Sequence, residues 1–289
     1  MTTKTNTLRH LIETRKPLVV PFAYDAFSAK LIEAAGFPAA GISGSSVAAS
    51  AFGLPDVGLL SREDVVGQAR HVAAAVTIPV FADADTGYGG PLQAAHTVRA
   101  VEDAGLAGLF MEDQEDPKRC AHLDGTIVIP VEAMLGKLKA VLGARRDNDF
   151  LIIARTDAVE SEGVEGAAKR ARAYLDAGAD MAFLAGPSTV EELEIFPKLV
   201  GQGRFMVVLT EGGKTPLLPA SQLSDMGYSL IGYSGLAIGS AAKAVQDSLN
   251  ALKRQGSNSD LIDRVMPLGD RNEILELAKW QQLETDTLS

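Results

Sequence analysis

The sequence predicts an α/β fold, a closed (βα)8 barrel of the TIM type, and three observations lead to this prediction. Eight short apolar runs of strand length alternate with eight helical patterns, which is typical of a parallel sheet covered by helices. Some of these runs, such as residues 150–154, are apolar at every position, which indicates strands buried on both faces. The chain has 289 residues, and a barrel of this kind usually needs about 250.

The elements follow one another in a regular order after a short first helix, expected over residues 8–15. Strands are expected at residues 18–22, 39–43, 79–83, 107–112, 150–154, 180–184, 205–209 and 228–231. Helices are expected at residues 24–35, 62–76, 90–104, 130–145, 163–177, 188–199, 219–226 and 235–253. Four helical patterns end in a glycine (Gly36, Gly105, Gly178 and Gly227). Glycine just past a helix supplies the left-handed residue that ends it.

No linker-like composition interrupts the chain before about Gln255. We therefore predict one barrel over residues 1–254 and a C-terminal helical extension over residues 255–289. A (βα)8 barrel does not need this extension, so we expect it to cover a neighbouring surface or subunit.

Composition excludes several classes of partner. Lysine and arginine number 27 against 37 acidic residues, a formal charge of −10, which argues against nucleic acid or anionic membranes as partners. The first ten residues lack the apolar core of a signal peptide, and no stretch is long and apolar enough to span a membrane. A single cysteine fits a reducing compartment. A cytoplasmic enzyme is the expectation.

Acidic residues follow two consecutive predicted strands. Asp83 and Asp85 close the third strand, and Glu112 closes the fourth. The carboxyl ends of barrel strands meet at one mouth, where the chemistry of such barrels takes place. Three hard oxygen ligands suit Mg²⁺ or Mn²⁺ and not zinc. The alternative is that these acids cap helices or pair with arginines at the rim.

Other strand ends carry groups that can bind an acid or transfer a proton. The only cysteine, Cys120, lies in a polar loop with Lys118, Arg119 and His122, where neighbouring cations should lower its pKa toward neutrality. The alternative is an inert core thiol. Residues 43–46, Ser-Gly-Ser-Ser, offer successive backbone N–H groups to an anion, or form a plain turn. Arg155 can grip a carboxylate, or pair with Asp157.

Several of these segments together resemble the isocitrate lyase / phosphoenolpyruvate mutase superfamily. The resemblance rests on residues 83–89, 112–114, 118–122 and 154–157, supported by residues 43–46, 53–56 and 211–216. It is collinear from about residue 15 to residue 285. It implies a (βα)8 barrel, magnesium, a 2-oxo or 2-hydroxy di- or tricarboxylate substrate, and a homotetramer whose subunits exchange C-terminal helices.

The resemblance also implies roles for individual residues. Asp83 and Asp85 would hold the metal, with Glu112 behind its waters. Cys120 would be the general acid, with Lys118 and His122 as further catalytic residues. Substrate would be bound by Ser43, Gly44, Ser45, Arg155, Ala121 and Thr210. The loop of residues 118–122 is similar to that of the carbon–carbon lyases, and residues 211–216 favour the group of dimethylmalate lyase, petal death protein and carboxyphosphonoenolpyruvate mutase.

Five positions depart from the superfamily's lyase pattern. Ala121 replaces a glycine, and Gly41 stands where 2-methylisocitrate lyases carry a tyrosine. Ala185, Val208 and Gly239 stand where those enzymes carry polar ligands. A third carboxylate would be desolvated without partners at such positions. We therefore expect a dicarboxylate with an apolar substituent.

The predicted reaction is a Mg²⁺-dependent retro-aldol cleavage of a 2-hydroxy dicarboxylate to a 2-oxo acid and a carboxylic acid. Within enzymes, the alternatives are oxaloacetate hydrolysis or decarboxylation, and phosphonate chemistry of the carboxyphosphonoenolpyruvate mutase type. From another class, the alternative is a metabolite-binding barrel without catalysis.

Overall fold

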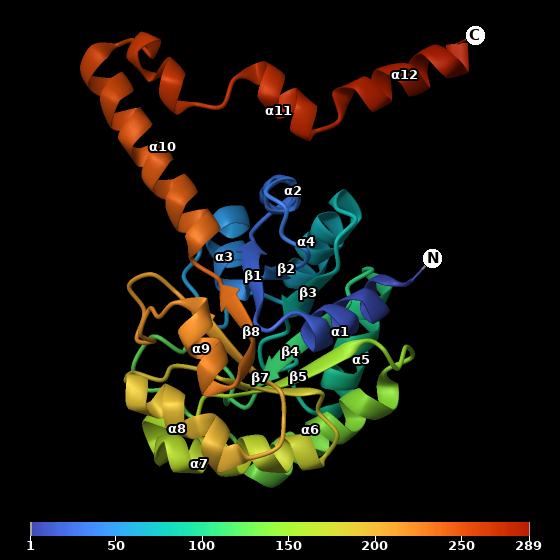
Figure 1. Ribbon diagram of the computed structural model, residues 1–289, viewed down its shortest axis with the longest axis vertical. Coiled ribbons are helices and arrows are strands. Elements are labelled where there is room, and N and C mark those ends of the chain that lie inside the picture. Colours follow the sequence, from blue (N-terminus) through green and yellow to red (C-terminus); the bar gives the residue numbers. More distant parts are fainter. Residues whose placement is uncertain (1, 289) are drawn as a thin grey trace.

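Eight parallel strands close into a barrel, in the order β1 to β8, within residues 2–288, the part of the chain that the computed structural model describes (Figure 1). The strands are β1 (Leu18–Ala23), β2 (Ala40–Ile42), β3 (Val80–Asp83), β4 (Gly108–Glu112), β5 (Leu151–Thr156), β6 (Met181–Leu184), β7 (Phe205–Leu209) and β8 (Tyr228–Tyr233). Leu18 of β1 pairs with Leu230 of β8, which closes the ring. The predicted (βα)8 barrel is confirmed.

Helices alternate with these strands and continue beyond the barrel. They are α1 (Lys4–Thr14), α2 (Ala26–Ala34), α3 (Gly44–Val47), the π-helix η1 (Ala48–Phe52), α4 (Arg62–Ala75), α5 (Pro91–Asp103), α6 (Val131–Ala144), α7 (Val159–Asp176), α8 (Val190–Val200), α9 (Ala220–Met226), α10 (Leu236–Gln255), the 3-10 helix η2 (Ser259–Arg264), α11 (Leu268–Ile274) and α12 (Leu277–Leu288). The four glycines expected to end helices all have positive φ.

The differences from the predicted elements are local. Helix α1 begins at Lys4 and not at residue 8, because the Thr3 hydroxyl accepts a hydrogen bond from the Asn6 N–H and caps the helix there. The short helices α3 and η1 after β2 were not predicted; their nine residues contain no 3.6-residue apolar period that would signal them.

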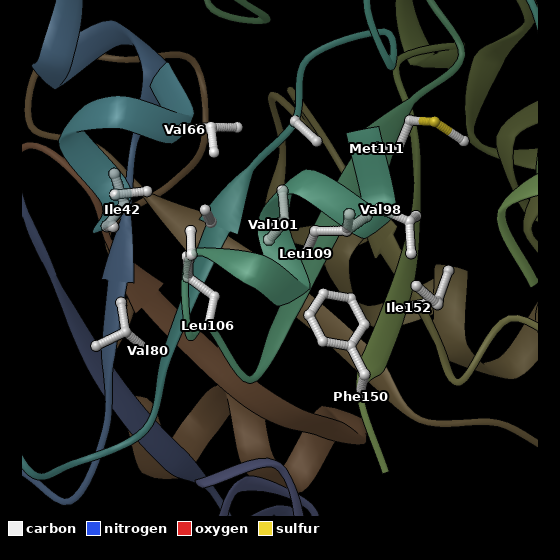
Figure 2. Packing of buried hydrophobic residues seen from close by; sticks show 14 of the residues in the cluster. Ile42, Val66, Val80, Val98, Val101, Leu106, Leu109, Met111, Phe150 and Ile152 are labelled. Atoms are coloured by element: carbon white, nitrogen blue, oxygen red, sulfur yellow. The ribbon is translucent and has the colours of Figure 1, made fainter. Parts of the chain in front are cut away.

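The core has two layers, inside and outside the strand cylinder. Figure 2 shows the outer layer, in which Leu109 of β4 lies beside Val98 of α5 and Ile42 of β2 lies on the side of Val66 of α4. The inner layer is aromatic: Phe22, Phe81, Phe110 and Phe183 meet edge to face or tilted, with ring centroids 5.5–6.3 Å apart. Each buried side chain of this size contributes about 1.5–3 kcal/mol.

Helix α1 covers the amino end of the barrel. Its Leu8 and Ile12 are buried with Leu18 and Val20 of β1. The Arg9 guanidinium donates to the carbonyl of Asp149, just before β5. The opposite, carboxyl end is therefore the one that remains for a ligand.

The C-terminal helices leave much apolar surface uncovered. Helix α10 points away from the barrel, and α11 and α12 continue from it (Figure 1). Of the described residues, α10 buries only Ala251 and α11 and α12 bury none, while Trp280 is 67% exposed. None of the helices within residues 2–288 is both long and apolar enough to cross a membrane.

Candidate active site

The residues predicted from strand ends converge at the carboxyl mouth of the barrel. One cavity of about 70 Å³ is lined there by Ser43, Ser45, Asp83, Cys120, Ala121, His122, Arg155 and Thr210, all predicted, together with residues that were not. Gly44, Asp85 and Lys118 line a smaller neighbouring cavity. Glu112 lies behind, ion-paired with Arg155.

Two carboxylates lie side by side after β3. Strand β3 ends at Asp83, and the chain turns so that Asp85 has a positive φ of 44°. The Asp85 N–H donates to Asp83 Oδ1 at 3.0 Å, and the Gly44 N–H donates to Asp83 Oδ2 at 3.3 Å. Burial, and then repulsion from Asp85, raises the pKa of Asp83 to about 6. The two acids thus form a compact anionic pair that a cation would stabilise.

Arg155 is held between two other carboxylates. Its Nε and NH2 groups donate to the two oxygens of Asp157 at 2.9 and 2.8 Å, and its NH1 group lies 2.9 Å from Glu112 Oε2. The guanidinium also lies over the Phe183 ring, 5.4 Å from the centroid. Burial opposes its charge, but the two carboxylates raise the pKa of Arg155 well above its usual value. From the sequence, Arg155 was expected either to bind a carboxylate or to pair with Asp157. It does pair with Asp157, and it also lines the cavity.

Lys118 is an ammonium held by two acids. Its Nζ lies 2.7 Å from Asp85 Oδ1 and also donates to Asp56. Burial alone would lower the pKa of Lys118, yet Asp85 and the other surrounding acids raise it. Asp56 was missed as a site residue, although residues 53–56 were part of the resemblance. It lines both cavities, and its carbonyl accepts a hydrogen bond from the Cys120 N–H.

Cys120 lies in the loop of residues 116–126, which we call the Cys120 loop. The expectation that cations bring the pKa of Cys120 toward neutrality is wrong, because burial raises the pKa of the thiol and outweighs the lowering by Arg155 and Lys118. The Lys118 ammonium is itself paired with Asp56 and Asp85, and Arg119 is exposed. The thiol therefore keeps its proton at neutral pH, which suits a proton donor better than a nucleophile.

His122 is fixed on the other side of the same loop. Its Nδ1 accepts the backbone N–H of Lys214 at 3.1 Å, and burial lowers its pKa. The neutral ring therefore carries its proton on Nε2. Two glycines allow this packing: a Cβ at Gly213 would lie 2.8 Å from His122 Nδ1, and one at Gly186 would lie 3.0 Å from the Ala121 carbonyl.

Hydroxyl groups line the mouth from β2, β7 and β8. Ser43 Oγ lies 3.0 Å from Ser45 Oγ, and Thr210 Oγ1 lies 2.7 Å from the hydroxyl of Ser234, which was not predicted. The turn with free N–H groups expected over residues 43–46 is instead the start of α3, capped by Ser43. The side chains of Ser43, Ser45, Thr210 and Ser234 line the cavity, so their hydroxyls are available to a ligand.

Apolar side chains line the rest of the cavity, from Phe22, Phe110, Phe183, Ala185 and Val208. The absence of a side chain at Gly41 is explained by Phe22, whose ring lies 2.4 Å from where a Cβ at Gly41 would be. The ring occupies the space that a tyrosine would need. Gly239 is exposed, on α10, outside the residues that line the cavity.

The donor chemistry of the acids fits a hard divalent cation. Within residues 2–288 no three His, Cys, Asp or Glu side chains converge as a ready-made metal cluster, and Asp85 is paired with Lys118. However, Glu112 Oε1 is buried without a hydrogen-bond partner in the described part of the chain, and burial raises the pKa of Glu112 well above its usual value. An orphaned acceptor of this kind suits a water or a metal-bound water.

A parallel barrel with charged and thiol groups at its carboxyl mouth defines an enzyme of the (βα)8 class. The family described as phosphoenolpyruvate phosphomutase matches residues 8–253. The chain belongs to this family, within the isocitrate lyase / phosphoenolpyruvate mutase superfamily, and is an enzyme of the carbon–carbon lyase type. The resemblance drawn from the sequence is confirmed.

Curated relatives match over nearly the whole chain. A 2,3-dimethylmalate lyase of Eubacterium barkeri is 38% identical and covers 96% of each chain. The petal death protein of Dianthus caryophyllus is 39% identical over 98% of this chain and 89% of its own. A probable 2-methylisocitrate lyase of Corynebacterium glutamicum is 39% identical over 91% of this chain and 85% of its own.

Solved structures agree with the fold. A 2,3-dimethylmalate lyase has a TM-score of 0.92 at 32% identity, covering 99% of this chain and 96% of its own. An oxaloacetate acetylhydrolase has a TM-score of 0.93 at 30% identity, covering 99% and 97%. A phosphonopyruvate hydrolase in complex with oxalate and Mg²⁺ has a TM-score of 0.91 at 28% identity, covering both chains fully.

Proposed function

We propose that this enzyme cleaves a 2-hydroxy dicarboxylate carrying a small alkyl substituent, by a retro-aldol reaction that needs Mg²⁺. The observation that carries the proposal is one small cavity lined both by Arg155 and Cys120 and by apolar side chains that include Ala185 and Val208. The names of the relatives, dimethylmalate and methylisocitrate lyases, support the same class of substrate.

The side chains divide the work as follows. Arg155 binds a substrate carboxylate, and the hydroxyls of Ser43, Ser45 and Thr210 donate hydrogen bonds to it. The bond between C2 and C3 breaks, its electron pair passes to C3, and the Cys120 S–H delivers a proton to that carbon. The proton of the 2-hydroxyl passes to solvent water as C2 becomes a carbonyl, and solvent returns a proton to the Cys120 thiolate. The Lys118 ammonium supplies positive charge, and the neutral His122 ring a hydrogen-bond donor at Nε2, beside the enolate-like fragment that forms.

The metal would be held by Asp83 and Asp85, with Glu112 accepting from its waters. Magnesium, or manganese in its place, supplies a Lewis acid for the oxygen on C2. Lys118 would then remain paired with Asp56, which keeps its ammonium beside the site.

The apolar wall selects the substrate. Ala185 and Val208 offer no hydrogen bond to a third carboxylate, and burying such a group unpaired costs several kcal/mol. We therefore propose that dimethylmalate-like acids are cleaved and that tricarboxylates are poor substrates.

The test is a coupled assay for 2-oxo acid release in Mg²⁺ across 2-alkylmalates, 2-methylisocitrate, isocitrate, oxaloacetate and phosphonopyruvate. Rapid release from 2,3-dimethylmalate supports the proposal. Rapid turnover of 2-methylisocitrate, with none of the alkylmalates, contradicts it.

The similarity to oxaloacetate acetylhydrolase favours hydrolysis of oxaloacetate as a second candidate. Cys120→Ser separates the two, because a lyase loses its proton donor while a reaction that needs only metal and carboxylate binding keeps most of its rate. Phosphonate chemistry would appear in the same panel as turnover of phosphonopyruvate.

We also propose a homotetramer in which the C-terminal extension, residues 255–289, packs on a neighbouring barrel of residues 1–254. The support is the exposed apolar surface of this extension, including Leu268, Trp280 and Leu283. Light scattering should give the mass of four chains; a monomer would contradict it. The cytoplasmic location stays a prediction.

A further inference from the structure

The side chain of Gln114 joins the Cys120 loop to the barrel. Gln114 lies just past β4 and is 1% exposed. Its Nε2 donates to the Arg119 carbonyl at 2.8 Å, and its Oε1 accepts the Arg119 N–H at 2.9 Å. The Gln114 side-chain amide therefore hydrogen-bonds to both the N–H and the carbonyl of Arg119, the residue before Cys120.

The same amide reaches the arginine of the site. The second hydrogen of Gln114 Nε2 points to Asp157 Oδ1 at 3.0 Å. That oxygen also accepts from Arg155 NH2 at 2.8 Å. Cys120 and Arg155 line the same cavity. Hydrogen bonds through Arg119, Gln114 and Asp157 also connect the loop that carries the thiol to Arg155.

Other contacts hold the loop without making this connection. The stem is closed by a bridge between Gln114 and Val128 and by the Glu115 N–H on the Ile127 carbonyl. These bonds use backbone atoms and are unaffected by the side chain at position 114. Two further hydrogen bonds hold the loop in place. The Cys120 N–H donates to the Asp56 carbonyl, and the Lys214 N–H donates to His122 Nδ1.

We propose that Gln114 is a positioning residue that keeps the Cys120 thiol in register with the Arg155 guanidinium. Both donors of its amide and one acceptor lobe are used, so the amide orientation is fixed by three partners. A substrate carboxylate that binds Arg155 and holds it against Asp157 therefore also stabilises the position of the Cys120 loop. The consequence for turnover rests on the proposed lyase function, whereas the connection itself does not.

Two nearly isosteric variants test this. Gln114→Met removes all three hydrogen bonds and keeps the volume. Gln114→Glu removes both donors and sets a carboxylate against Asp157 and the Arg119 carbonyl. The exposed Gln202 of the turn after α8 gives the matched control, Gln202→Met.

The first readout is alkylation of Cys120, the only cysteine in the chain, by iodoacetamide in Mg²⁺, with and without oxalate as a 2-oxo acid mimic. Both Gln114 variants should react about tenfold faster than the wild type and lose protection by oxalate, while Gln202→Met behaves as wild type. The second readout is steady-state kinetics, where kcat should fall about 100-fold with KM changed less than about threefold.

Alkylation rates and oxalate protection equal to those of the wild type in both variants would overturn the inference, even with a lower kcat, because a purely structural role would leave the thiol equally shielded. If the wild type turns over none of the acids, the proposed function fails, yet the alkylation comparison still decides the role of Gln114.

Discussion

The two walls of the active-site cavity differ in kind. The wall that follows β3 and β5 carries Asp83 and Arg155, with Glu112 of β4 behind them, whereas the wall from β1, β6 and β7 presents Phe22, Ala185 and Val208. Charged side chains can polarise a substrate and transfer protons, whereas apolar side chains only select a substrate by the size and polarity of its substituent. We therefore read the first wall, with the Cys120 loop, as the part that determines the reaction, and the second as the part that determines the substrate.

The largest effect is expected from the proton donor. Cys120→Ser should lower kcat for alkylmalate cleavage by about 10²–10⁴-fold, the usual contribution of a positioned acid, because a serine hydroxyl is a much weaker acid than a thiol. Oxo acid release is the measurement. A variant with more than half of the wild-type rate would move the reaction to the hydrolase alternative.

The next effect is metal removal. Chelation with EDTA should abolish oxo acid release, since Asp83 and Asp85 alone leave two anions where positive charge is needed. Adding back Mg²⁺ or Mn²⁺ should restore it, whereas Ca²⁺, which tolerates a looser geometry, should restore less. Full activity after exhaustive chelation would show that these acids have another purpose.

Arg155→Lys should lower kcat/KM by about 100-fold, with most of the effect in KM. A lysine cannot donate to Asp157 through two groups and to a substrate at once, and breaking a buried charge pair costs about 2–5 kcal/mol. Circular dichroism of the variant provides the folding control. An unchanged KM would mean that Arg155 serves only the Asp157 and Glu112 pairs.

Val208→Asn addresses the apolar wall and should leave kcat for 2,3-dimethylmalate within about threefold. It should improve 2-methylisocitrate relative to 2,3-dimethylmalate by about tenfold, since it restores one hydrogen-bonding group. A variant with lower activity on both acids and no change in their ratio would argue that Val208 does not face the substituent.

The smallest effect lies behind the charged wall. Tyr174 donates to Asp113 Oδ2 at 2.8 Å, and the Asp157 N–H donates to Asp113 Oδ1. Tyr174→Phe removes one of several bonds to Asp113, so unfolding should become easier by about 1 kcal/mol, with activity within about twofold. A thermal melt and a kinetic assay check this; a large loss of activity at unchanged stability would place Tyr174 closer to the reaction.

Much of the fold and of the active site can be predicted from the sequence, because strands and the residues at their ends give local sequence patterns. The runs before Asp83, Glu112 and Arg155 predict where three charged side chains leave the sheet, and the barrel brings them together. The sequence also singles out Cys120 by the cations beside it in a polar loop, whereas the catalytic roles of Cys120, Lys118 and His122 came from the resemblance to a superfamily.

What the sequence missed depends on contacts made through space. Lys118 and Arg119 are neighbours of Cys120 along the chain, but Lys118 is paired with Asp56 and Arg119 is exposed. Burial of the thiol outweighs the nearby cations, so the pKa of Cys120 rises. Phe22 fills the space beside Gly41, a contact between two strands that no local pattern reports. Helix α10 has an ordinary amphipathic sequence, and nothing in it signals that it leaves the barrel.

Residues of the charged wall carry out the cleavage, and residues of the apolar wall select the substituent of the substrate. The most direct test is the ratio of kcat/KM for 2,3-dimethylmalate to kcat/KM for 2-methylisocitrate in Mg²⁺. Both acids release pyruvate on cleavage, so one assay serves for both. The account predicts that 2,3-dimethylmalate is preferred by about 100-fold or more, because the third carboxylate finds no partner at Ala185 or Val208. A ratio below one would contradict it.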